Sequence, residues 1–195
     1  ENQVIYINGN FNNKLYQTYA HEGMPGHMYQ YSYFMGIEGM HPVRRLIGES
    51  SNSEGWATYA ENIATRYVHD EGFLGFKEAM DNLQNVVLVK ADIGVNYYGW
   101  TLQEFTDYML EYFELDANDK ALKDTYIQLA NTPGVIATYN LSSMYISDLK
   151  LMVMQELDDR YDEVEFHRAF LNVGSASFDI IEYELKKFIA SERVK

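Results

Sequence analysis

The segment from His21 to His27, with the sequence His-Glu-Gly-Met-Pro-Gly-His, places the strongest constraint on how the chain can fold. Pro25 has no N–H to donate to the carbonyl of His21, four residues earlier, and Gly26 tolerates backbone angles that other residues resist. A regular helix therefore does not run through this segment, although apolar and aromatic residues flank it on both sides. We expect a helix on each side, joined by a bulge or an unwound turn.

The rest of the chain shows apolar residues at helical spacing, with turn residues between the segments. A Thr-Leu-Gln-Glu capping box opens one helix at Thr101, and Thr132 suits an N-cap before Pro133 at the first position of another. Val4–Asn8 is β-branched and aromatic, which predicts a short strand. The predicted helices cover about residues 13–22, 27–35, 51 or 53 to 69, 74–95, 101–113, 119–131, 133–157, 163–172 and 178–191. The sequence therefore predicts one mainly α domain over residues 1–195 with a short N-terminal strand.

Composition excludes several classes of function. The net charge of −14 argues against nucleic-acid binding, because few cations are available to neutralise phosphates. No apolar run reaches the length of about 20 residues that a membrane span needs. The absence of cysteine excludes disulfides and thiolate zinc ligands. The abrupt start on a strand-like segment is compatible with a fragment of a longer protein.

The two histidines of the interrupted segment are candidate zinc ligands. On an unbroken helix, residues six apart lie about 120° out of register and about 9 Å apart along the axis, so one metal could not bind both. The break at Pro25-Gly26 offers a way to absorb the two extra residues and bring His27 back to the face of His21. Glu22, next to His21, would then be the general base of a zinc hydrolase. The alternative is that both are ordinary helix histidines beside a simple helix break.

A catalytic zinc usually has three protein ligands, and Glu54 is the best candidate for the third. Its helix also carries Glu61, seven residues on and on the same face, as a fallback ligand or as a partner that orients a histidine. An alternative explains Glu54 without a metal, because Ser51-Asn52-Ser53-Glu54 fits a capping box. His167 lies on an amphipathic helix and is interpreted as structural.

These blocks resemble those of the bacterial DUF885 family, whose members are regarded as zincin-like metallopeptidases. The segment from His21 to His27, followed by Gln30, is similar to the family's His-Glu-x-x-Pro-Gly-His motif. Ser53-Glu54-Gly55-Trp56-Ala57 and Tyr59-Ala60-Glu61 resemble its second block, whose first glutamate is taken as the third ligand. The resemblance covers nearly the whole chain.

Two later blocks match less closely. Pro133-Gly134 followed by Tyr139 resembles a third block, and Tyr139 is on that basis a candidate donor to the oxyanion of the transition state. The family usually has a lysine after this tyrosine, where this chain has Asn140. One more packing tyrosine is the alternative for Tyr139. Glu165-Phe166-His167 with Gly174 echoes the last block.

The resemblance implies a zinc-dependent peptide hydrolase with a zincin-like helical fold. The expected ligands of Zn²⁺ are His21, His27 and Glu54, and the expected partner is a peptide or peptide-like substrate. Family members are longer, so the chain would be the C-terminal, metal-bearing portion of a bacterial protein, with a secreted or cell-envelope location as the candidate. Two alternatives stay open, namely a helical module that binds a metal or peptide without catalysis, and a zinc hydrolase of non-peptide amides or esters. The oligomeric state is also left open.

Overall fold

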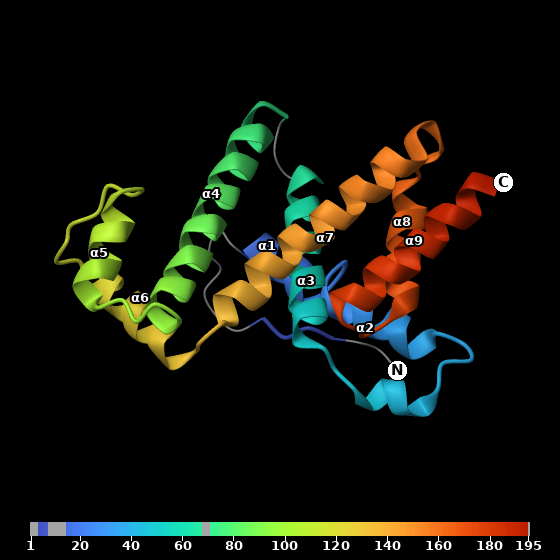
Figure 1. Ribbon diagram of the computed structural model, residues 1–195, viewed down its shortest axis with the longest axis horizontal. Coiled ribbons are helices and arrows are strands. Elements are labelled where there is room, and N and C mark those ends of the chain that lie inside the picture. The colour runs from blue at the N-terminus through green and yellow to red at the C-terminus, as the bar shows by residue number, and fades with distance from the viewer. Residues whose placement is uncertain (1–3, 8–14, 68–70, 195) are drawn as a thin grey trace. The chain divides into compact units, whose positions relative to one another are not determined.

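A computed structural model of the chain describes residues 4–7, 15–67 and 71–194, and helices make up most of these residues (Figure 1). The α-helices are α1 (Leu15–Glu22), α2 (His27–Gly36), α3 (Ser50–Ala64), α4 (Glu71–Asn96), α5 (Leu102–Leu110), α6 (Lys120–Asn131), α7 (Val135–Leu157), α8 (Glu163–Val173) and α9 (Phe178–Val194). Short 3-10 helices cover Pro42–Leu46, Thr65–Tyr67 and Asp158–Arg160. The mainly α fold predicted from the sequence is confirmed.

The predicted strand over Val4–Asn8 is wrong for the residues that can be compared. Val4–Ile7 has no regular secondary structure, and Asn8 lies outside the described residues. No strand forms anywhere in the described ranges, so the extended segment has no neighbour to pair with its backbone N–H and C=O groups. β-Propensity alone therefore did not determine the local structure.

The chain divides into two compact units. The first consists of residues 1–68 and 142–195, and the second of residues 69–141. Helix α7 contributes its first turns to the second unit and the remainder to the first. The single domain predicted over 1–195 stays a prediction. None of the described helices is both long and apolar enough to cross a membrane.

The first unit is built on α3, which packs against α1 and α2, while α8 packs against α2 and α9. Figure 1 shows α8 and α9 side by side at the C-terminal end of the chain. The core of the first unit contains Trp56, Phe166, Phe170, Ile181 and Leu185, all at most 3% exposed. Burying such large side chains supplies the main driving force for packing these helices, at about 25 cal/mol per Å² of apolar surface.

The second unit packs α4, α5 and α6 together around a core that includes Val87, Phe105 and Leu129. The capping box predicted at Thr101 is confirmed, because Thr101 and Glu104 exchange hydrogen bonds at the start of α5. Beyond it, Asp92 of α4 is 2% exposed and receives hydrogen bonds from Asn96 and from backbone N–H groups at the start of α7.

The predicted start of α7 is wrong, and the carboxylate of Asp92 explains the difference. The helix begins at Val135 and not at Pro133, and Gly134 adopts a positive φ of 77° immediately before it. The N–H groups of Gly134 and Ala137 donate to Asp92 at 3.1 and 3.4 Å. A residue about 40 positions earlier in the chain thus satisfies donors that Thr132 was expected to satisfy.

His167, interpreted from the sequence as structural, is half-buried in the first unit. Its ring packs edge-on against Trp56, and its Nε2 atom lies 2.8 Å from the Tyr59 hydroxyl, with which it forms a hydrogen bond. Burial lowers the pKa of His167 and raises that of Tyr59, and so favours the neutral form of both side chains.

A lowered pKa in the folded state means that the unfolded state binds this proton more readily. The contribution of His167 to stability is therefore complete above its ordinary pKa of about 6.5 and is lost as the pH falls below that value. We expect His167→Gln to reduce the loss of unfolding free energy between pH 7.5 and pH 5.5, measured by urea titration at each pH. Other titrating groups are common to both proteins and cancel in the comparison. An equal loss in both proteins would contradict the assignment.

Candidate metal centre

The break between α1 and α2 absorbs two residues without losing the helical register of the two histidines. The N–H of Gly26 donates to the carbonyl of Ala20 at 2.9 Å, six residues back, where a regular helix would use the carbonyl four residues back. The N–H of Tyr29 makes a second such bond, to Gly23, at 3.3 Å. Residues 23–26 leave the helical conformation, with a cis peptide bond between Met24 and Pro25. The predicted departure from regular helix is confirmed.

As a consequence, the rings of His21 and His27 face one another. Their centroids are 4.8 Å apart and the ring planes meet at 89°. A spacing of six residues therefore acts here as a spacing of four, and both histidines lie on one face. The interpretation of them as unrelated helix histidines does not explain this convergence.

Gly26 is essential to the close backbone approach at the break. A Cβ atom at this position would lie 1.8 Å from the carbonyl oxygen of His21 and 2.5 Å from that of Ala20. Trp56 of α3 fixes the other side of the turn, because its indole N–H donates to the carbonyl of Pro25 at 3.0 Å. The turn is thus held from both sides and belongs to the packed core of the first unit.

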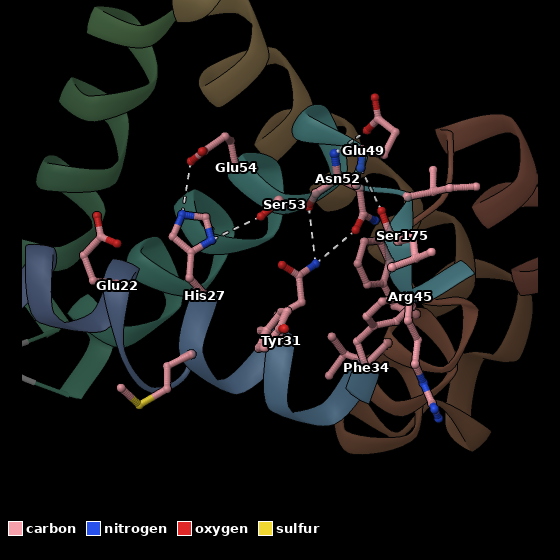
Figure 2. Close-up of a pocket in the computed structure, with 18 residues that line it drawn as sticks. Glu22, His27, Tyr31, Phe34, Arg45, Glu49, Asn52, Ser53, Glu54 and Ser175 are labelled. Carbon is pink, nitrogen blue, oxygen red and sulfur yellow. Dashed lines mark hydrogen bonds and ion pairs between the residues drawn. The ribbon is translucent and has the colours of Figure 1, made fainter. Parts of the chain in front are cut away.

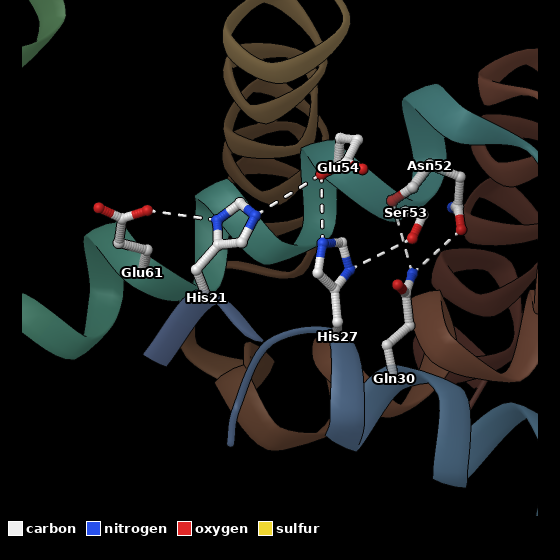
Figure 3. A network of polar contacts seen from close by, with 7 residues as sticks. All are labelled: His21, His27, Gln30, Asn52, Ser53, Glu54 and Glu61. Carbon is white, nitrogen blue, oxygen red and sulfur yellow. Dashed lines mark hydrogen bonds and ion pairs between the residues drawn. The ribbon is translucent and has the colours of Figure 1, made fainter. Parts of the chain in front are cut away.

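Glu54 lies on α3, and its carboxylate faces both histidines (Figure 3). Its Oε2 atom is 3.2 Å from Nε2 of His27 and 3.6 Å from Nε2 of His21. The capping-box alternative is wrong, since α3 begins at Ser50 and its N-cap is Glu49, which accepts from the N–H of Asn52. Glu54 therefore projects from within the helix toward the histidine pair.

The three side chains have donor atoms that zinc takes, and they lie close enough together for a metal site to be geometrically possible. One ligand atom from each of His21, His27 and Glu54 lies within 4.8 Å of the other two. Zinc bonds of about 2.0–2.1 Å in a tetrahedron place neighbouring ligand atoms about 3.4 Å apart. The distances from Oε2 of Glu54 to Nε2 of His27 and of His21, 3.2 and 3.6 Å, are close to this value. Two imidazoles and a carboxylate are also a ligand combination that zinc takes.

The other nitrogen of each ring has its own partner, which fixes the ring orientation. Nδ1 of His21 lies 3.3 Å from Glu61, and Nδ1 of His27 lies 3.3 Å from Oγ of Ser53 (Figure 3). In the tautomer that donates from Nδ1, each Nε2 carries the lone pair that would bind a metal. Glu61 was predicted as such a partner, whereas Ser53 was missed because its contact depends on how α2 and α3 pack.

The carboxylates around His21 give the site a negative potential. The hydrogen bond to Glu61 raises the pKa of His21, and Glu22 and Glu54 act in the same direction, while burial opposes them. The site therefore attracts positive charge, whether a proton or a metal ion.

A pocket of about 650 Å³ opens beside the triad, within the first unit (Figure 2). Glu22, His27 and Glu54 lie at one part of its wall, and Arg45 and Ser175 at another, as Figure 2 shows. Its volume is typical of sites for small ligands. Glu22 is exposed at this pocket, as a residue that exchanges protons with bound water would be.

Tyr139, the remaining predicted site residue, lies half-buried on the part of α7 that belongs to the second unit. The Pro133-Gly134 pair before it has a structural explanation in the hydrogen bond from Gly134 to Asp92. Its role as a transition-state donor stays a prediction.

These features define a class of protein, a mainly helical one in which a broken helix presents two histidines to a glutamate of a packed neighbouring helix. Residues 7–185 match the DUF885 family, described as bacterial proteins of unknown function, and the chain belongs to this family. The family assignment made from the sequence is confirmed. No curated protein matches the chain.

Two solved structures share the fold. One is described as the putative lipoprotein from Colwellia psychrerythraea, with a TM-score of 0.71 and 25% identity over 89% of this chain. The other is described as a putative lipoprotein of unknown function from Shewanella oneidensis, with a TM-score of 0.69 and 23% identity over 89% of this chain. The chain spans 30% and 31% of those proteins, respectively.

Because backbone carbonyls lie so close to Gly26, adding one methyl group at this position should strongly affect stability. We expect Gly26→Ala to lower the free energy of unfolding by about 3 kcal/mol, the upper end for overpacking, because the neighbouring carbonyls cannot move without disrupting the turn. The measurement is urea denaturation followed by far-UV circular dichroism.

Gly36, at the end of α2, is the matched control, since a Cβ there would meet nothing within 4 Å. Gly36→Ala should leave stability unchanged or raise it by up to about 1 kcal/mol. Equal effects at the two positions would show that the turn does not need its glycine.

Proposed function

We propose that this chain carries the zinc centre of a peptide hydrolase, with His21, His27 and Glu54 as the ligands. The observation that carries the proposal is that Nε2 of both histidines faces the same carboxylate oxygen of Glu54 while each Nδ1 is held by another polar group. Random polar contacts between helices would not orient all four ring nitrogens in this way.

The ligand number favours catalysis over a structural role. Structural zinc sites usually use four protein ligands, whereas catalytic sites use three and leave a position for water or substrate. Among the described residues the group contains three such ligands, and it adjoins a pocket large enough for a small substrate. A module that only binds a metal would not need that pocket.

Zinc bound by these residues would supply Lewis acidity and lower the pKa of a bound water toward neutrality. Glu22 follows His21 directly and lines the pocket with His27 and Glu54, so its carboxylate is the candidate base. It would take the proton of the attacking water and return it to the nitrogen of the leaving amine. The two similar structures are described as putative lipoproteins, which supports a location at the bacterial cell envelope for the longer protein.

Zinc binding is tested by elemental analysis and calorimetric titration of chelator-treated protein. We expect one zinc per chain, a melting temperature that falls when a chelator removes it, and loss of binding in His27→Ala and Glu54→Ala. Glu61→Gln should weaken zinc affinity by about 10–100-fold, because the group that orients His21 loses its charge.

Glu184→Gln, which changes a half-buried glutamate of α9 that pairs with Lys187, is the control and should bind zinc as the wild type does. Zinc binding that survives the loss of Glu54 would exclude the proposed ligand set.

Catalysis is tested by amine release from a mixture of casein peptides with zinc-loaded protein. We expect Glu22→Gln to retain zinc but lose hydrolysis by at least about a hundredfold, since the amide cannot act as a base. Glu38→Gln, an exposed glutamate of the loop after α2, should keep full activity. A zinc-loaded Glu22→Gln protein with unchanged activity would rule out this base, and a zinc-loaded wild type that cleaves only esters would identify a different hydrolase.

A further inference from the structure

The pocket beside the candidate metal centre has an apolar part to which the proposed function gives no role. Its exposed members are Tyr31, Leu46 and Ile47, which are 62%, 86% and 58% exposed. These three side chains are the apolar rim of the pocket. Exposed apolar side chains that line one pocket together, and are not scattered singly, mark a surface that binds something.

Helix α2 connects the apolar rim to the candidate metal. Tyr31 and Phe34 follow His27 by four and seven residues, so the three side chains lie in one row on the helix. At 1.5 Å per residue, Tyr31 lies about 6 Å and Phe34 about 10 Å from His27 along the helix axis. Figure 2 shows the three side chains in this order along the pocket.

The apolar surface beneath the rim is fixed by core packing. Phe34 and Phe170 both line the pocket and are 8% and 1% exposed. Gly174 has a φ of 72°, and a Cβ there would lie 2.5 Å from the ring of Phe34, so the chain approaches this ring as only glycine allows. A ligand would therefore meet a surface that is already formed, which lowers the cost of ordering side chains on binding.

This part of the pocket suits an apolar group better than an acidic one. A carboxylate placed against apolar side chains loses hydration, and it needs a cation to compensate. Arg45 is the single lysine or arginine among the described residues that line the pocket, and its guanidinium donates to the carbonyl of Ile37 at 3.0 Å. Ile37 follows the last residue of α2, about 9 Å beyond Tyr31 along the helix axis.

We infer that the apolar rim binds a large apolar side chain of the substrate, with Tyr31 as a residue that determines this specificity. An extended peptide advances about 3.3–3.6 Å per residue, so a scissile bond at the candidate metal places a side chain one or two residues away beside Tyr31. The inference rests on the proposed function and names its substrate class, which is peptides with a side chain of the size of leucine or phenylalanine at that place.

The test measures the binding of four hydroxamates to the zinc-loaded chain by calorimetry. Acetohydroxamic acid carries the zinc-binding group with only a methyl group. Isocaprohydroxamic acid and hydrocinnamohydroxamic acid add a branched aliphatic group and a phenyl ring, and succinic monohydroxamate adds a carboxylate. We expect the two apolar compounds to bind at least about tenfold more tightly than acetohydroxamic acid, the lower end for burying a large apolar group. Succinic monohydroxamate should bind no more tightly than acetohydroxamic acid.

A double variant, Tyr31→Ala with Ile47→Ala, removes two side chains of the apolar rim and leaves every candidate zinc ligand in place. We expect the preference for hydrocinnamohydroxamic acid to fall below about threefold, while acetohydroxamic acid binds as before. Tyr183→Ala is the matched control, because Tyr183 of α9 is 63% exposed and lies outside this pocket. It should keep the full preference, and the zinc content of each variant shows whether its metal centre is intact.

The cleavage sites in casein peptides, identified by mass spectrometry, test the same inference in the reaction. We expect leucine and phenylalanine to be enriched over their abundance in the mixture at one position within two residues of the cleaved bond. The double variant should lose this enrichment and still cleave. Enrichment that persists unchanged in the double variant would exclude the apolar rim as its source.

The outcomes separate this inference from the proposed function. Equal binding of acetohydroxamic and hydrocinnamohydroxamic acids would overturn the apolar subsite and leave the zinc centre standing. Succinic monohydroxamate as the tightest ligand would make Arg45 the recognition residue in place of the rim. A wild-type dimer in sedimentation that the double variant dissociates would assign the rim to a contact between two copies. Failure of acetohydroxamic acid to bind would overturn the proposed function, and the subsite with it.

Discussion

The hydrogen bond from the N–H of Gly26 to the carbonyl of Ala20 is the contact on which the candidate site depends. It joins residues six apart in the geometry that a helix gives to residues four apart, so the chain gains two residues and keeps its register. His21 then ends one helix and His27 begins the next, yet their rings share a face. The glycine is required because any Cβ would collide with the same carbonyls that the turn brings close.

Helix α3 supplies the other half of the site, and its position is fixed independently of any metal. The indole of Trp56 donates to the turn at Pro25, and Gly55 brings α3 so near to α7 that a Cβ there would lie 2.6 Å from Cβ of Ser142. Glu54 directly precedes Gly55 and Trp56 in the sequence. Its carboxylate is therefore placed by core packing, which is how a site is held to the small tolerances that metal coordination demands.

Local signals in the sequence were enough to predict most helices and the broken helix, because proline, glycine and capping residues act on their immediate neighbours. Contacts between distant segments were not predictable in the same way. Asp92 caps α7 from α4, and Ser53 reaches His27 only because α2 and α3 pack together. The strand predicted at Val4 failed for the same reason, since a strand needs a partner that sequence propensity cannot provide.

Charge explains why this arrangement suits a cation in a chain with a net charge of −14. The carboxylates of Glu22, Glu54 and Glu61 surround two imidazoles, and Glu61 above all raises the pKa of His21. The same negative potential that raises the pKa of His21 would favour a divalent ion, which competes with a proton for the imidazole. Glu61 and Ser53 each hold Nδ1 of one ring, and both Nε2 atoms face Oε2 of Glu54. The proposed metal ion would therefore bind both Nε2 atoms at once.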